Sequence, residues 1–209
     1  MKKVLFICFL LLFNVPIFSQ YKAIVELNKN SSLSILVETN MMNFSLVQKG
    51  DKLQSTPVAL SAHIQKNKLF VDHNKLDIDV RGFKSNNLIA QGEFYKLMMV
   101  DKFPRMNIEL LQFESGTENN VNLSCGTAIL NITITNVTRK YEFPVLINAD
   151  NGLMRISGKK KLSITDFGLT APKTLLLGMV KINEQIEIDL NFLCKLNVKN
   201  NDLADHPAQ

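Results

Sequence analysis

The sequence predicts an all-β protein, an antiparallel β-barrel with one short helix. Three observations lead to this fold class. Apolar and polar residues alternate with a period of two over most of the chain, as in strands that bury one face. Turn signals separate these segments, and a single segment has helical spacing instead. Because a sheet with many strands must protect its edges, closure into a barrel is the simplest arrangement.

Four segments of alternation come before the final one. Their apolar positions are Leu33, Ile35 and Val37; Val58, Leu60, Ala62 and Ile64; Leu76, Ile78 and Val80; and Ala128, Leu130, Ile132 and Ile134. Turn signals that contain glycine occur at Lys49–Asp51, Ser115–Gly116, Asp150–Gly152 and Ser157–Gly158. We therefore expect a strand to end at each of these four places.

The segment "NNLIAQGEFYKLMMVDKFP", residues 86–104, breaks the two-residue pattern. Leu88, Phe94, Leu97 and Met98 recur in it at roughly helical spacing. Pro104 ends the pattern, since the residue before a proline is disfavoured in a helix. This spacing predicts one short helix between strands.

The final segment, "VKINEQIEIDLNFLCKLNVK", has the clearest alternation. Its even-numbered residues from Val180 to Val198 are apolar apart from Glu184, and its odd-numbered residues are polar apart from Leu193. One face is therefore buried and the other solvated, as in antiparallel sheet. The length predicts either a strongly bent strand or two strands divided near Asn183–Glu184.

The amino terminus differs from the rest of this 209-residue chain. Lys2 and Lys3 precede an apolar run that is too short to span a bilayer and ends at Ser19–Gln20, which is typical of a cleaved secretory signal peptide. We expect residues 1–19 to be removed, residues 20–199 to form one domain and 200–209 a loose tail. The mature protein is then periplasmic or secreted, with no transmembrane segment.

Charge and cysteine content narrow the partners and the chemistry. Without the leader, 22 basic and 19 acidic side chains remain, and a net charge of +3 is too small to indicate nucleic-acid binding. Cys125 and Cys194 could form a disulfide in an oxidising compartment or remain buried thiols. Because the three histidines have no spacing typical of ligands, no metal site is predicted.

The sequence "ITDFGLTAP", residues 164–172, looks like the magnesium loop of a protein kinase. A kinase also needs a glycine-rich phosphate loop and a His-Arg-Asp loop, and the sequence contains neither. We assign Asp166, Phe167 and Gly168 to structure instead: Gly168 permits a turn or bulge, and Asp166 satisfies nearby backbone N–H groups. No catalytic residue is predicted, and we expect the protein not to be an enzyme.

Two stretches, "GTAILNITITNVTRKYEFPV" (126–145) and "RISGKKKLSITDFGLTAPKTLLLGMVKINEQIEIDLNF" (155–192), resemble the YceI-like family of bacterial exported proteins. The matching positions are Gly126, Ile132, Thr138, Pro144–Val145 and the Asp-Phe-Gly at 166–168. The resemblance extends from Leu33 to about Leu196. Gly92–Glu93 and Ile164–Thr165 stand where the family commonly has Asp-His and Arg-Ser, so no headgroup contact is carried over.

This resemblance implies a lipocalin-like barrel of about eight strands that holds a long-chain isoprenoid, of the polyprenyl or isoprenoid-quinone type, in its lumen. No cofactor is implied, and a homodimer is left open. The predicted lumen lining is Ile132, Ile134, Val180, Ile182, Ile186, Ile188, Leu190 and Phe192. The same residues could fill a solid core, in which case the protein is a structural or protein-interaction module of the cell envelope. A hydrolase is a third, more distant reading.

Overall fold

The computed structural model describes residues 20–53, 57–72, 74–120, 123–150, 152–171 and 181–199. The expected signal peptide, the C-terminal tail and Val180 lie outside these residues. The described strands are β1 (Gln20–Leu27), β2 (Ser32–Thr39), β3 (Phe44–Lys49), β4 (Val58–Gln65), β5 (Lys68–Asp72), β6 (Leu76–Asp79), β7 (Arg105–Asn120), β8 (Leu123–Ile134), β9 (Val137–Asp150), β10 (Leu153–Ser163) and β11 (Ile182–Lys199). The helical elements are α2 (Gly50–Leu53), η2 (Val80–Gly82), α3 (Leu88–Leu97) and η3 (Ile164–Phe167).

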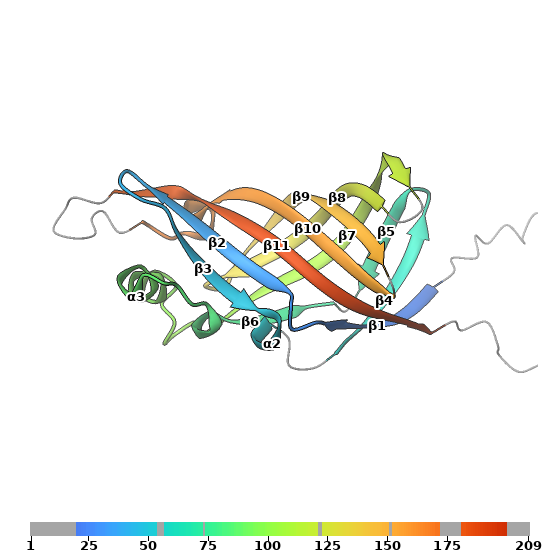
Figure 1. The fold of residues 1–209 in the computed structure, drawn as a ribbon, viewed down its shortest axis with the longest axis horizontal. Coiled ribbons are helices and arrows are strands. Elements are labelled where there is room, and N and C mark those ends of the chain that lie inside the picture. The colour runs from blue at the N-terminus through green and yellow to red at the C-terminus, as the bar shows by residue number, and fades with distance from the viewer. Residues whose placement is uncertain are drawn as a thin grey trace, which may run out of the picture.

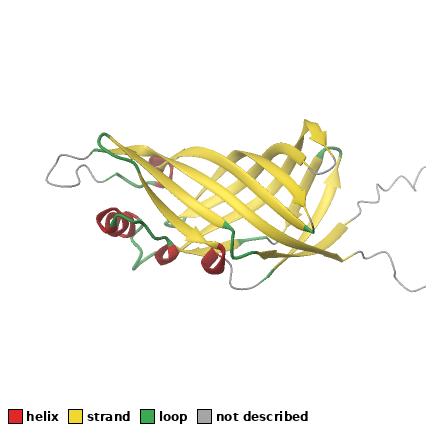
Figure 2. Ribbon diagram, viewed as in Figure 1, coloured by secondary structure: helices red, strands yellow, loops and turns green. Residues whose placement is uncertain are grey.

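The predicted barrel is confirmed, because eight strands close into a ring in the order β1-β4-β5-β7-β8-β9-β10-β11 (Figures 1 and 2). The antiparallel pairing of β1 with β11 completes the ring. Strands β2 and β3 continue from β11 toward the α3 end of the barrel, and β6 pairs with β7. At that end the described residues join β3 to the segment after β6 through a single bridge, between Val47 and Lys84.

The final segment forms one strand, so of the two predicted alternatives the structure shows the single strand and not the division into two. Strand β10 pairs with β11 without interruption from Lys195 to Gln185. On the other edge of β11, residues 194–199 pair with β1 and residues 186–191 with β2. The register of the β2 pairing shifts between Ile182 and Ile186, so the irregularity lies where the division was expected.

Two of the four predicted turns are also wrong. Gly116 lies within β7, where the pairing with β8 is irregular, and Gly158 lies within β10. A Cβ on Gly158 would lie 2.4 Å from the carbonyl oxygen of Pro144 on the neighbouring strand. This glycine is therefore required for close approach of two strands rather than for a turn.

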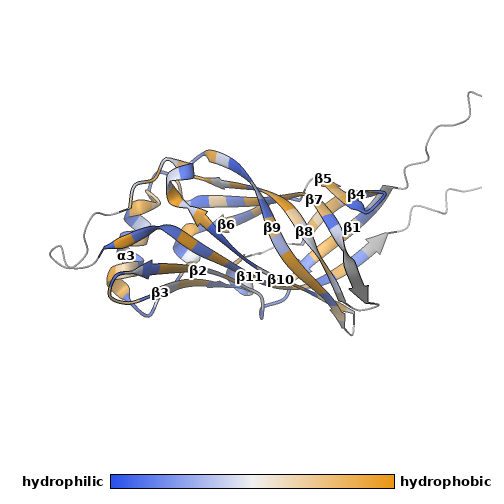
Figure 3. Ribbon diagram, turned by 90° about the horizontal axis from the view of Figure 1, so that it is seen from above, coloured by the Kyte–Doolittle hydropathy of each residue, from blue (hydrophilic) through white to orange (hydrophobic). Residues whose placement is uncertain are grey.

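Helix α3 is the predicted short helix, and it lies at one end of the barrel (Figures 1 and 3). Its N-cap is Asn87, whose Oδ1 accepts a hydrogen bond of 3.0 Å from the N–H of Ala90. The helix turns Ala90 and Phe94 to the interior, whereas Leu88 is 77% exposed. Leu88 is thus not part of the buried face that the spacing suggested. Among the described residues, no helix is long and apolar enough to cross a bilayer.

Candidate functional site

A cavity of about 70 Å³ lies inside the barrel at the α3 end. Strands β2, β3, β7, β8, β10 and β11 form its walls, and α3 and η3 cover it. The described residues that line it are apolar except for Glu93, which is half-buried, and Asn183, which is exposed. The site therefore has an apolar interior with polar groups toward solvent, which suits an apolar ligand with a polar end.

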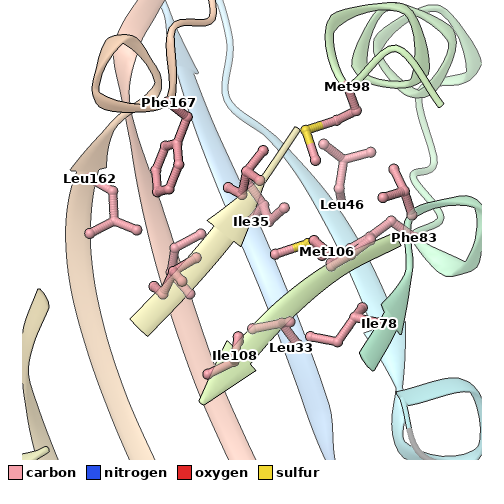
Figure 4. Packing of buried hydrophobic residues seen from close by; sticks show 14 of the residues in the cluster. Leu33, Ile35, Leu46, Ile78, Phe83, Met98, Met106, Ile108, Leu162 and Phe167 are labelled. Carbon is pink, nitrogen blue, oxygen red and sulfur yellow. The ribbon is translucent and has the colours of Figure 1, made fainter. Parts of the chain in front are cut away.

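The walls come from the alternating pleat of long strands. Inward residues such as Ile35, Ile108 and Ile132 are buried, while their sequence neighbours face outward. In Figure 4, Leu162 and Phe167 point into the interior from β10 and η3, toward Ile35. Across the interior lie Met98, at the end of α3, and Met106, on β7. Alternation along each strand thus builds the apolar interior.

Five predicted lining residues meet in this cavity. Ile132 and Ile134 come from β8, and Ile182, Ile186 and Ile188 come from β11. Strands β8 and β11 are not neighbours in the sheet, so the barrel brings their inward faces together across the lumen.

The other three predicted residues do not line the cavity. Leu190 is buried in the hydrophobic core and Phe192 packs against it, farther along β11 than the cavity extends. Both have the expected inward parity and belong to the hydrophobic core rather than to the cavity lining. Val180 lies outside the described residues.

Helix α3 supplies one side of the cavity, which the sequence reasoning missed. Ala90, Phe94, Leu97 and Met98 line it, and their spacing of four, three and one is that of one helical face. The spacing was visible in the sequence, but the position of the helix depends on contacts with distant residues. The Tyr95 hydroxyl lies 2.9 Å from the carbonyl oxygen of Arg81 and 2.8 Å from that of Phe83, and shares its proton between them.

An aromatic contact also seats α3 on the barrel. The rings of Phe83 and Phe94 meet edge to face, with centroids 5.6 Å apart. On the adjoining loop, the backbone N–H of Ser85 donates a hydrogen bond of 3.0 Å to Oε1 of Gln91. The helix is thus held by a few side-chain contacts and no strand ladder.

The Asp-Phe-Gly segment forms the opposite part of the cover. Phe167 is buried in η3 and lines the cavity. Gly168 follows with φ of 71° in the left-handed region, and a Cβ there would meet no atom within 4 Å. The backbone conformation, rather than lack of space, is therefore what favours glycine.

The partner of Asp166 differs from the expected one. Its carboxylate accepts a hydrogen bond of 2.7 Å from the hydroxyl of Tyr141 on β9, a side chain rather than backbone N–H groups. The pKa of Tyr141 is raised well above its ordinary value, first by burial and then by the hydrogen bond and the negative charge of Asp166. This bond ties η3 to the barrel wall.

The remaining polar candidates lie elsewhere. No disulfide joins Cys125 to Cys194. Burial raises the pKa of the Cys194 thiol to about 11, so it is protonated at neutral pH and is a poor nucleophile. His63 stacks on Phe70 with ring centroids 5.0 Å apart, on strands that do not line the cavity. Within the described part of the chain, no group of three or more His, Cys, Asp or Glu side chains is arranged to hold a metal ion.

A family model described as a YceI-like domain matches residues 27–193 of this chain. Among solved structures, a polyisoprenoid-binding domain from Saccharophagus degradans implicated in plant cell wall breakdown has a TM-score of 0.58 at 9% identity, over 86% of this chain and 99% of that chain. BcnA of Burkholderia cenocepacia has a TM-score of 0.50 at 11% identity, over 80% and 99%. At these identities the structural likeness concerns the fold alone. No curated protein sequence matches the chain.

Proposed function

Because the chain belongs to the YceI-like family, we propose that it is a non-catalytic lipid-binding protein that stores or carries a long-chain isoprenoid in the α3 end of its barrel. The observation that carries this proposal is the cavity, whose described lining has only two polar residues among 22. The solved polyisoprenoid-binding domain of the same fold supports the choice of ligand class. The polar end of the lipid would lie beside Glu93 and Asn183.

The hydrophobic effect is sufficient for such binding. Burial of each methylene group contributes about 0.8 kcal/mol, so three isoprene units contribute about 12 kcal/mol before costs. A micromolar complex needs about 8 kcal/mol, which leaves about 4 kcal/mol for ordering the lipid. No polar contact is required for affinity, and the headgroup contacts serve orientation.

The size of the cavity adds a condition to the proposal. An engineered apolar cavity of about 150 Å³ accepts benzene, and this one is about 70 Å³. Entry of an isoprenoid therefore requires lining side chains to move. Met98 and Met106 are suited to this, because an unbranched methionine changes rotamer at low cost.

The same small volume favours a second candidate, a filled barrel that serves as a structural or interaction module of the cell envelope. Native mass spectrometry of the protein purified from its own cell envelope separates the two. The carrier gives a stoichiometric additional mass that an organic solvent extracts. A bare chain that also fails to bind added isoprenoid quinone supports the filled barrel and rejects the carrier.

The proposed place of action is outside the cytoplasm, in the periplasm or the medium. The support is the sequence of residues 1–19, with its two lysines and short apolar run. Mass spectrometry of the mature protein tests this proposal. The expected first residue is Gln20, and a chain that retains Met1 in the cytoplasmic fraction would reject it.

A further inference from the structure

The α3 end of the barrel displays large apolar side chains to solvent. Four of them are Met41 and Met42, with exposures of 61% and 53%, and Leu88 and Ile89, with exposures of 77% and 54%. The first pair lies in the turn between β2 and β3 and the second in the first turn of α3. Figures 1 and 3 agree that this turn and α3 lie at the same end of the barrel. We call these four residues the rim.

The rim lies close to the cavity lining along the chain. Val37 and Phe44, on either side of the β2–β3 turn, line the cavity, and so does Ala90, which follows Ile89 directly. Each rim pair therefore lies within a few residues of the cavity lining. Apolar side chains scattered singly over a surface need no explanation, whereas these four occur as two pairs at one end of the barrel.

The turn that carries the two methionines is held in a defined conformation. The hydroxyl of Thr39 accepts hydrogen bonds from the N–H groups of Met41, at 3.3 Å, and Met42, at 3.0 Å. The side chain of Asn40 accepts a hydrogen bond of 2.7 Å from the N–H of Lys181, beside the start of β11. The methionines are thus displayed from a turn that is tied to the barrel wall.

We propose that the rim inserts into the surface of a lipid bilayer and docks the mouth of the cavity onto it. This proposal deepens the proposed function and rests on it, because a bilayer is where an isoprenoid is available for loading. Area argues against a protein partner: four side chains of this exposure present on the order of 400 Å², about half of the roughly 800 Å² per partner of a standard interface.

Charge complementarity supports the bilayer as the occupant. Lys181 adjoins the methionine turn, and Lys84 lies beside α3, with its Nζ 3.3 Å from the Tyr95 hydroxyl. Both are exposed, and neither forms an ion pair with another described residue. Apolar side chains flanked by lysines are the composition that binds at an anionic membrane interface.

The experiment uses the delipidated mature protein and vesicles that contain no isoprenoid. One vesicle is phosphatidylethanolamine with phosphatidylglycerol and the other is phosphatidylcholine alone, and bound protein is measured by flotation. The test variants are the pairs Met41→Ser with Met42→Ser and Leu88→Ser with Ile89→Ser. The matched control is Ile64→Ser, because Ile64 is 54% exposed but lies on β4, at the other end of the barrel (Figure 1).

We expect the wild type to float with the anionic vesicles, and each rim pair to bind them at least about tenfold more weakly. A tenfold change corresponds to the transfer of about two methylene groups, fewer than either pair loses. The control should bind like the wild type. Failure of the wild type to float, or an equal loss in the control, overturns the proposal. A wild-type dimer in sedimentation that the rim variants dissociate assigns the rim to a second copy and also overturns it.

A second measurement does not depend on comparing binding strengths. The chain contains no tryptophan, so Leu88→Trp and Ile64→Trp each introduce a single tryptophan, whose emission is excited selectively at a wavelength where tyrosine does not absorb. Insertion predicts a blue shift of Leu88→Trp emission on vesicles and its quenching by brominated lipid, with neither effect in Ile64→Trp. If Leu88→Trp binds the vesicles but its emission does not shift, insertion is rejected. The flotation experiment contains no isoprenoid, and native mass spectrometry contains no vesicles. The docking proposal and the lipid-binding proposal are therefore tested independently, and either can be rejected without the other.

Discussion

Replacing Met98 by alanine should lower the stability of the ligand-free protein and increase the stabilisation that a bound ligand provides. Met98 is 4% exposed, follows the last residue of α3 and lines the cavity. Its replacement removes three heavy atoms, whose transfer free energy is about 2 kcal/mol. A residual void of about 50 Å³ adds about 1 kcal/mol at 24 cal/mol per Å³. We therefore expect the free energy of unfolding to fall by about 3 kcal/mol.

A ligand that fills the enlarged cavity should restore part of the lost free energy of unfolding. A ubiquinone with two isoprene units is a suitable probe, and urea unfolding followed by circular dichroism measures stability with and without it. The gain on adding the quinone should be larger for Met98→Ala than for the wild type. The control is Ile78→Ala, since Ile78 is fully buried in the same core but does not line the cavity. Ile78→Ala should lose a similar amount of stability, but the quinone should stabilise it by no more than it stabilises the wild type. Equal gains in all three proteins would refute the assignment of the cavity as the lipid site.

Three further predictions concern the wall, the cover and the leader. Ile188→Arg places an unpaired charge in the apolar wall and should abolish quinone uptake or folding; a folded variant with normal uptake, measured by native mass spectrometry, contradicts the lumen assignment. Since the pKa of Tyr141 is raised above its ordinary value of 10.0, its contribution to stability is fully present below pH 10 and is lost as pH rises further. Tyr141→Phe should cost about 1 kcal/mol at pH 7 and reduce this alkaline slope in urea titrations, and an unchanged slope would show that the pair does not contribute. Deleting residues 2–19 should leave the protein in the cytoplasmic fraction, whereas export of the truncated chain would reject the leader.

Much of the fold could be predicted because it depends on local patterns. Alternation in a strand identifies which side chains share a face, and it placed Ile132, Ile134 and Ile188 on the inner face of the barrel. The alternation does not show how far along each strand the cavity extends. Leu190 has the same parity as Ile188 and is buried in the same core, yet only Ile188 lines the cavity, because the position of the cavity along the barrel depends on the opposing walls.

The errors concern residues whose role is set by distant partners. A glycine in a turn and a glycine beneath a neighbouring strand look the same in sequence. The sequence therefore predicts a turn at Gly158, whereas in the structure the carbonyl of Pro144 lies against this glycine. The lining role of α3 depends on the contacts of Tyr95 with Arg81 and Phe83, which bring the helix over the barrel mouth. Side-chain spacing alone does not contain that information.

The two ends of the barrel differ in the number of backbone hydrogen bonds that must break before the barrel can widen. At the β1 end, a continuous antiparallel ladder joins β1 to β11. At the α3 end, the described residues connect β3 to the segment after β6 by two backbone hydrogen bonds, of 2.8 Å and 2.9 Å, between Val47 and Lys84. Widening of the barrel should therefore be confined to the end that contains the cavity. That end can then accept ligands of different width while the rest of the barrel keeps its shape. Amide hydrogen exchange at Val47 and Lys84 should accordingly be faster than along the β1–β11 ladder.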